Sequence, residues 1–293
     1  MNTPGNKFRE AITDNKPLMV VGAINAYCAK MAENAGHKAL YLSGAGVANA
    51  SFGLPDLAIT TLNDVAEDSR RITQATNLPL LIDIDTGFGG AFSISRTIKE
   101  MIAADVAAVH IEDQVTQKRC GHRPNKSLVD KTEMTDRIKA AVDARTDDSF
   151  FIMARTDSYA SEGMQGAIDR CNEYISAGAD GLFLEAVSSL EDYKQLKDAL
   201  QVPLLANITE FGKTPLFSAQ ELASVGVDIM LFPLSAFRAM NKAAESVYID
   251  IAENGSQVNS VEKMQTRDEL YEYLNYHSFE QKLDELFKRK EKK

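Results

Sequence analysis

Eight short apolar runs recur along the chain, and amphipathic stretches separate them. Each run is rich in Val, Ile, Leu or Phe and is short enough to form a buried strand. The stretches between them show helix signals: Ser218 with Glu221 forms a capping box, and Gly36 and Gly178 stand where helices stop. The apolar runs lie at residues 18–25, 39–44, 79–85, 107–113, 150–157, 181–186, 203–209 and 229–234.

Eight strand–helix units in a chain of 293 residues predict an α/β fold, a (β/α)8 barrel. A doubly wound parallel sheet is the alternative, but it usually contains fewer strands. We expect a single barrel domain over residues 1–293, in which 235–293 form the last barrel helix and additional C-terminal helices. The barrel does not need those additional helices, so they would cap one end of it or pack on another subunit.

The charge balance and the cysteine content narrow the class of protein. The net charge of −10 argues against general nucleic-acid binding. There is no long uncharged apolar run, which argues against a membrane span, and the first sixteen residues lack the apolar core of a signal peptide. Cys28, Cys120 and Cys171 are too far apart for a disulfide framework or a zinc site, so we expect a protein of the reducing cytoplasm.

Polar residues gather at the C-terminal ends of the apolar runs. Side chains alternate along a strand, so residues two apart share a face. Strand C-termini meet at the mouth of a barrel, where active sites lie. Loops begin there too, but chance accounts less readily for same-face pairs on four strands. The pairs are Asp83 with Asp85, His110 with Glu112, Arg155 with Asp157, and Asn207 with Thr209, while Ser43 and Glu185 end two further runs.

The carboxylates at these ends suggest a hard cation. Asp83 and Asp85, with Glu112 and Asp56, offer oxygen ligands without a cluster of His or Cys. That pattern suits Mg²⁺ or Mn²⁺ better than zinc. The alternative is that the acids only pair with Arg155 or Lys118. Buried carboxylates repel one another when no cation is near, which favours the metal.

One cysteine stands in a markedly basic segment. Residues 118–126 read KRCGHRPNK, and Gly121 and Pro124 mark the segment as a loop. Positive neighbours lower the pKa of a thiol, so Cys120 suits a nucleophile, a metal ligand or a proton donor. The other two cysteines fall in helical stretches and are expected to be core thiols. For His110 two roles stay open, orienting Glu112 or serving the core structure.

The motifs LYLSGAGVA, GLPDLAITTLNDV, DIDTGFGG, HIEDQ, KRCGHRPNK, MARTD, NITEFGKTPLF and FPLSAFRAMN resemble the isocitrate lyase / phosphoenolpyruvate mutase superfamily. The resemblance runs from about Phe8 to the C-terminal helices. The Lys-Arg-Cys-Gly-His loop resembles the lyase branch, and phosphonate-handling relatives lack it. The resemblance implies a reversible, Mg²⁺-dependent cleavage of 2-methylisocitrate to pyruvate and succinate, late in propionate breakdown by the methylcitrate cycle. It also implies a homotetramer in which a C-terminal helix is exchanged between subunits.

The resemblance also implies roles for individual residues. Cys120 would be the proton donor to the succinate carbanion, and Arg155 would offset charge. The base that takes the hydroxyl proton stays open among Tyr41, a metal-bound hydroxide and a water held by Glu112. Asp83 and Asp85 would hold the metal, with Asp56 and Glu112 in its water shell. The residues implied to bind the small tricarboxylate substrate are Ser43, Gly44, Ala45, Gly121, His122, Arg155, Glu185, Asn207, Ile208, Thr209, Arg238 and Arg267.

Three other functions compete with this one. A lyase acting on isocitrate or a substituted malate would differ by as little as one methyl group, worth only ~1–3 kcal/mol of discrimination. A phosphonate mutase or hydrolase is opposed by Cys120. A non-enzymatic sensor or binding protein for a tricarboxylate is opposed by the combination of Cys, Arg and carboxylates.

Overall fold

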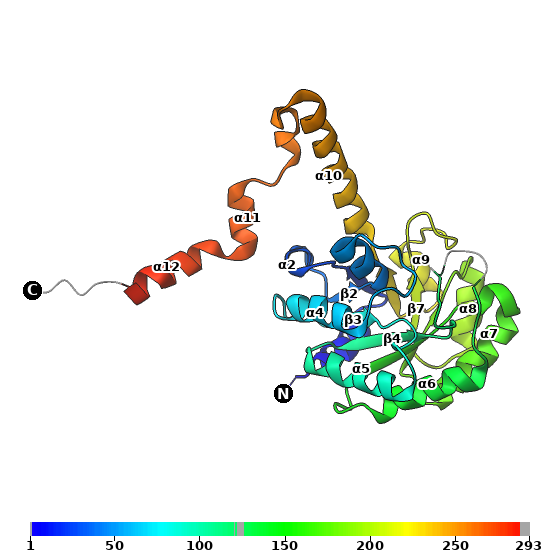
Figure 1. Ribbon diagram of the computed structural model, residues 1–293. Coiled ribbons are helices and arrows are strands. Elements are labelled where there is room, and N and C mark those ends of the chain that lie inside the picture. Colours follow the sequence, from blue (N-terminus) through cyan, green and yellow to red (C-terminus); the bar gives the residue numbers. More distant parts are fainter. Residues whose placement is uncertain (1, 120, 122–125, 288–293) are drawn as a thin grey trace, which may run out of the picture. The chain divides into compact units, whose positions relative to one another are not determined.

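The apolar runs form eight parallel strands that close into one barrel, as Figure 1 shows. The structure is a computed structural model that describes residues 2–119, 121 and 126–287. The strands follow one another around the barrel in chain order, and β8 closes it by pairing with β1, Leu18 opposite Ile229 and Val21 opposite Phe232. The strands are β1 (Leu18–Gly22), β2 (Ala39–Leu42), β3 (Leu80–Asp83), β4 (Ala108–Glu112), β5 (Phe151–Thr156), β6 (Gly181–Leu184), β7 (Leu204–Asn207) and β8 (Ile229–Phe232).

Helices follow the strands, so the predicted (β/α)8 barrel is confirmed. The α-helices are α1 (Pro4–Asp14), α2 (Ala26–Asn34), α3 (Gly44–Gly46), α4 (Leu62–Thr73), α5 (Ala91–Ala103), α6 (Lys131–Asp143), α7 (Tyr159–Ser176), α8 (Leu190–Ala199), α9 (Ala219–Ser224), α10 (Ser235–Asn254), α11 (Arg267–Leu274) and α12 (Tyr276–Phe287). A π-helical turn η1 (Val47–Ser51) follows α3, and a 3-10 helix η2 (Val258–Lys263) follows α10.

Local sequence signals set the helix ends. The predicted capping box opens α9: the Ser218 amide donates to the Glu221 carboxylate at 2.7 Å, and the Glu221 amide donates to Ser218 Oγ. Glycines stand just beyond the ends of α2 and α7, where Gly36 has φ +92° and Gly178 φ +105°. A side chain is strained in that left-handed region, which is why glycine stops a helix there.

The core has two layers, one inside the barrel and one between the strands and the helices. The N-terminal helix α1 completes the inner layer, because Phe8 and Ile12 pack with the inward side chains of the strands. The ring of Phe8 meets that of Phe151 edge to face at 5.4 Å, and Phe8 is fully buried. Cys28 and Cys171 lie in the outer layer as core thiols, as predicted.

The chain divides into two compact units, Met1–Phe237 and Arg238–Lys293. The second unit contains most of α10 together with η2, α11 and α12, and none of these three α-helices buries a residue. Within the second unit the rings of Tyr271 and Tyr276 stack at 4.2 Å. The expectation of a single domain over 1–293 stays a prediction. Among the described helices, none is both long enough and apolar enough to cross a bilayer.

The packing of α1 generates a stability prediction. Replacing Phe8 by Ala leaves a cavity in the inner core layer, so the free energy of unfolding should fall by ~3–5 kcal/mol. Urea denaturation followed by circular dichroism measures this. The matched control is Phe92→Ala, because Phe92 is 93% exposed and its truncation should change little. Equal unfolding midpoints for the two variants would contradict a structural role of α1.

Candidate active site

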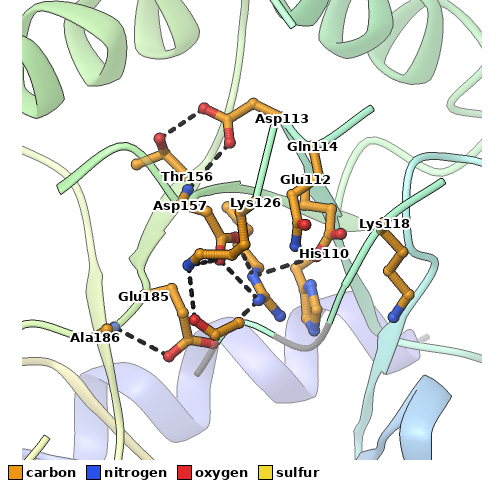
Figure 2. A network of polar contacts seen from close by, with 12 residues as sticks. His110, Glu112, Asp113, Gln114, Lys118, Lys126, Thr156, Asp157, Glu185 and Ala186 are labelled. Atoms are coloured by element: carbon orange, nitrogen blue, oxygen red, sulfur yellow. Dashed lines mark hydrogen bonds and ion pairs between the residues drawn. The ribbon is translucent and has the colours of Figure 1, made fainter. Parts of the chain in front are cut away.

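Polar side chains line the barrel mouth at the carboxyl ends of the strands, and Figure 2 shows part of this set. The strand register brings neighbours together, with Asp83 opposite His110 and Glu112 opposite Arg155. Inward residues lower on the same strands, such as Leu81 and Met153, belong to the inner core layer, so the predicted same-face pairs point into the mouth. These polar residues are buried: Ser43, Asp83, Asp85, His110, Glu112, Arg155, Asp157, Glu185, Asn207 and Thr209.

Arg155 is the central cation of the mouth. Its Nε lies 2.9 Å from Asp157 Oδ2 and 3.3 Å from Glu112 Oε2, and its Nη2 lies 3.1 Å from Glu185 Oε2. The guanidinium also sits over the Phe183 ring, 4.9 Å from its centroid. Burial opposes its charge, but the three acids outweigh burial and raise the pKa of Arg155 well above its usual value. The arginine is therefore permanently charged and is held in one orientation.

A second cation, Lys118, lies on the other side of the mouth. Its Nζ is 2.6 Å from Asp85 Oδ1 and 2.7 Å from Asp56 Oδ1, and its side chain is 3% exposed. Burial and the charge of Asp83 raise the pKa of Asp85 to about 7. Asp83 behaves in the opposite way: burial is outweighed by His110, Lys118 and Arg155, which lower its pKa to about 2. The mouth thus holds two adjacent carboxylates of very different acidity.

Tyr41 and His110 form a buried pair beside these carboxylates. Their rings stack at 5.7 Å, and Tyr41 Oη lies 2.9 Å from His110 Nε2. Burial lowers the pKa of His110 to about 4, and burial raises that of Tyr41 well above its usual value, so both are neutral at pH 7. His110 Nδ1 lies 3.7 Å from Asp83 Oδ1, and no hydrogen bond joins His110 to Glu112. Of the two roles left open for His110, contact with Tyr41 and Asp83 supports the structural one.

Of the four predicted metal residues, Asp83 and Asp85 lie next to each other. Among the described residues, no three His, Cys, Asp or Glu side chains lie close enough together to hold a metal by themselves. Asp83 and Asp85 do lie side by side, since both approach Gly44, and Mg²⁺ retains several waters, so two carboxylates suffice. Neither carboxylate oxygen of Glu112 accepts a hydrogen bond from the described part of the chain. Buried carboxylate oxygens of this kind fit a hard divalent cation.

The remaining predicted residues fall into three groups. Cys120 and His122 lie outside the described residues. Arg238 and Arg267 belong to the second unit. Around the mouth, Asn207 Nδ2 donates to Glu185 Oε1 at 3.3 Å, and Ser43, Thr209 and the half-buried Ala45 are near strand ends. The side chain of Ile208 packs in the outer core layer, so only its main chain is available to the mouth.

Two glycines bring the backbone against the charged groups. A Cβ on Gly44 would lie 3.1 Å from Asp83 Oδ2 and 3.2 Å from Asp85 Oδ1. A Cβ on Gly121 would lie 2.4 Å from Arg155 Nη2 and 2.6 Å from Glu185 Oε2. A side chain at Gly121 would therefore force the ends of the Arg155 and Glu185 side chains to move. Gly121 is therefore required for close approach to the arginine, in addition to any freedom it gives the loop.

Three charged residues that lie in the mouth were not among the predicted site residues. Lys118 was considered only as an ion-pair partner of the acids in place of a metal, Lys126 only as a positive neighbour of Cys120, and Asp157 only as the partner of Arg155 on one strand face. The predicted alternative partner Lys118 does pair with Asp56 and Asp85. Lys126 Nζ in fact lies 2.5 Å from Asp157 Oδ1, across 31 residues of sequence. The signal for both lysines was their position at the two ends of KRCGHRPNK.

Active sites of (β/α)8-barrel enzymes lie at the carboxyl ends of the strands, where the buried charges of this chain gather, so fold and site place it among those enzymes. The sequence matches the phosphoenolpyruvate phosphomutase family over residues 8–252. The chain belongs to that family, within the isocitrate lyase / phosphoenolpyruvate mutase superfamily, and it is a carbon–carbon lyase.

Relatives and solved structures resemble the chain over nearly its full length. The 2-methylisocitrate lyase of Vibrio cholerae is 61% identical over 291 residues, 97% of this chain and 94% of the relative. A crystal structure of 2,3-dimethylmalate lyase has a TM-score of 0.89 at 34% identity, covering 98% of this chain and 96% of the other. A phosphonopyruvate hydrolase in complex with oxalate and Mg²⁺ has a TM-score of 0.85 at 25% identity, covering 98% and 100%.

The close approach of Gly121 gives a prediction for the site. Gly121→Ala should displace Arg155 or the loop, and a misplacement of about 1 Å is enough to lower kcat/KM on the order of 10²-fold. Steady-state kinetics measure the loss, and thermal unfolding checks that the fold persists. Gly90→Ala is the matched control, because a Cβ there meets nothing within 4 Å. If the two variants are equally active, the loop does not seat Gly121 against Arg155 during turnover.

Proposed function

We propose that this enzyme cleaves 2-methylisocitrate to pyruvate and succinate, in the methylcitrate cycle of propionate breakdown. The observation that carries the proposal is the mouth itself: Arg155 and the adjacent carboxylates of Asp83 and Asp85 lie against Gly121 and Lys118, two residues of the segment that bears Cys120. The 61% identity to a protein named 2-methylisocitrate lyase supports the choice of substrate. A thiol that must stay reduced suits a reducing compartment such as the cytoplasm.

The substrate is a small tricarboxylate, and the mouth supplies groups that bind carboxylates. Arg155 presents a charged, oriented guanidinium that offsets one substrate carboxylate. Asn207 and Thr209, at the end of β7, supply amide and hydroxyl donors, and the backbone at Ser43, Gly44 and Ala45 supplies N–H groups. Glu185 orients both Arg155 and Asn207, because it contacts each of them. Binding of the substrate by Arg238 and Arg267 is part of the proposal.

Asp83 and Asp85 would hold Mg²⁺, or Mn²⁺, with Asp56 and Glu112 contacting its waters. When bound there, the cation supplies Lewis-acid stabilisation of oxygen charge that develops on the pyruvate half. The hydrolase related in structure was crystallised with Mg²⁺, which supports this choice. Lys118, already paired with Asp85 and Asp56, keeps the excess of buried negative charge balanced on that side.

The proton movements use residues of the chain. The hydroxyl of the substrate loses its proton, the adjacent C–C bond breaks, and the electron pair passes to the succinate half as an aci-carboxylate. Cys120 then donates a proton to that carbon, which completes succinate, while the C–O group becomes the ketone of pyruvate. Amide and hydroxyl donors stabilise the extra charge before protonation. The basic residues around Cys120 tune the pKa of its thiol.

The base that takes the hydroxyl proton is proposed among the groups beside Asp83. Tyr41 is one candidate, and its hydroxyl is held 2.9 Å from His110 Nε2. A water held by Glu112 is the alternative, since both carboxylate oxygens of Glu112 lack hydrogen-bond donors among the described residues.

Pyruvate release tests the proposal. With Mg²⁺ present, 2-methylisocitrate should be cleaved with a much larger kcat/KM than isocitrate or 2,3-dimethylmalate, and a chelator should abolish turnover. Cys120→Ser should fold and bind substrate but turn over ~10²- to 10⁴-fold more slowly, the usual worth of a general acid. A preference for isocitrate or the malate would move the enzyme to a neighbouring activity of the same family. Cleavage at wild-type rate by Cys120→Ser would remove its role as proton donor.

We also propose that the enzyme is a homotetramer in which a C-terminal helix is exchanged between subunits. In the barrel unit an apolar groove of about 490 Å³ is lined by Met19, Val21, Met31 and Phe232. The second unit leaves apolar side chains exposed, among them Tyr248, Ile249, Phe279 and Leu283. Exposed apolar surfaces of this kind support an interaction between proteins.

Truncation tests the exchange. A chain ended after Asn254 lacks η2, α11 and α12, and it should form a smaller assembly than the full chain by light scattering. Its barrel should keep the same circular dichroism signal, because the inner and outer core layers lie within residues 8–231. An unchanged tetramer would mean that the removed helices do not hold the subunits together.

A further inference from the structure

Lys126, the last residue of KRCGHRPNK, is buried between the cysteine-bearing loop and the barrel wall. Its Nζ lies 2.6 Å from the Gly121 carbonyl oxygen and 2.5 Å from Asp157 Oδ1. The exposed fractions of the Lys126 and Asp157 side chains are 8% and 0%. Figure 2 shows Lys126 beside Asp157, while Lys118 lies on the far side of Glu112. The two lysines therefore pair with acids on different sides of the mouth, Lys118 with Asp56 and Asp85 and Lys126 with Asp157.

The partner of Lys126 is also the partner of the central arginine. Asp157 accepts hydrogen bonds from Arg155 Nε at 2.9 Å and Nη2 at 3.3 Å. The amide of Asp157 donates to Asp113 Oδ1 at 3.0 Å, which fixes the carboxylate from behind. A single carboxylate thus joins Lys126 of the loop to Arg155 of the barrel.

The base of the loop does not depend on Lys126. Backbone hydrogen bonds join Val129 to Asp113 at 2.9 Å and Val115 to Ser127 at 3.0 Å, and they form a short ladder. Between these paired residues, the side chain of Gln114 makes two hydrogen bonds with the main chain of Arg119. Its Nε2 donates to the Arg119 carbonyl at 2.9 Å, and its Oε1 accepts from the Arg119 amide at 3.1 Å. Lys126 adds a further contact among the described residues of the segment, because its ammonium donates to the carbonyl oxygen of Gly121.

Both chain neighbours of Cys120 are therefore tied down, Arg119 by Gln114 and Gly121 by Lys126. We propose that Lys126 is a positioning residue for the lyase reaction: through Gly121 and Asp157 it fixes the cysteine-bearing turn and Arg155 in one mutual arrangement. The inference rests on the proposed function, in which Cys120 delivers a proton to a substrate held by Arg155. A buried ammonium loses its hydration, and here the carbonyl of Gly121 from the loop and the carboxylate of Asp157 from the barrel replace it together.

Lys126→Met tests the proposal, because it keeps most of the apolar stem and removes the ammonium. We expect kcat to fall on the order of 10²-fold, with a smaller change in KM, since Arg155 keeps its ion pairs with Glu112, Asp157 and Glu185. Lys126→Arg keeps a charged donor and should restore part of the rate. The control is Lys131→Met, which removes an exposed lysine paired with Glu173 and should leave kcat unchanged.

A second readout needs no substrate. In the ligand-free proteins, the rate of alkylation of Cys120 by iodoacetamide is measured by mass spectrometry of its peptide, with the buried Cys28 and Cys171 as internal references. Lys126→Met should raise the Cys120 rate several-fold relative to wild type and to Lys131→Met. If Lys126→Met fails to fold, Lys126→Gln, which can still donate to the Gly121 carbonyl, replaces it and should give an intermediate increase.

The outcomes separate the two proposals. Unchanged alkylation together with a kcat equal to that of Lys131→Met would overturn the positioning role. A lower melting temperature with wild-type kcat and alkylation would also overturn it, because Lys126 would then serve stability alone. The wild-type enzyme could cleave no tested substrate while Lys126→Met still raises the alkylation rate of Cys120. That result would contradict the proposed substrate but support the positioning role of Lys126.

Discussion

The charge balance around Arg155 is the interaction on which the mouth of the barrel depends. One buried guanidinium faces Glu112, Asp157 and Glu185, which come from three consecutive strands or strand ends. Without the cation, three carboxylates would be buried close together, and burial of unpaired charge costs several kcal/mol per group. Burial, together with the charges of Asp157 and Asp83, raises the pKa of Glu112 well above its usual value even beside Arg155 and Lys118. The same pairing fixes Arg155 in an orientation suited to a substrate carboxylate.

The two lysines of KRCGHRPNK extend this balance in opposite directions. Lys118 reaches Asp56, in the segment between η1 and α4, and Asp85, just after β3, whereas Lys126 reaches Asp157 just after β5. The segment between them carries Cys120. The ion pairs of Lys118 and Lys126 with buried acids account for the position of these two lysines in a chain with a net charge of −10. A side chain at Gly121 would displace Arg155 or Glu185, since Gly121 lies directly against both.

Much of the fold was predictable, because it rests on local periodicity. Eight apolar runs gave eight strands, and the Ser218–Glu221 box opened α9 as expected. The alternation of side chains also predicted which face Asp83, Glu112 and Arg155 share. Ile208 shows the limit of motif resemblance, since alternation sends its side chain to the outer core layer beside the inward Asn207 and Thr209. Contacts between strands that are distant in the sequence, such as His110 with Tyr41, could not be predicted. They depend on the register in which the strands pair, and neither segment determines that register by itself.

The sequence by itself determined the (β/α)8 architecture, the end of the barrel where charge gathers and the types of residue available there. These follow from period, capping and alternation, which act over a few neighbouring residues. Only the tertiary structure decided which charge pairs with which: Lys126 with Asp157, Lys118 with Asp56 and Asp85, and Arg155 with three acids at once. Such pairings depend on distances between segments far apart in the chain, and in a buried site a difference of a few ångströms decides whether a charge is stabilised or left without a partner.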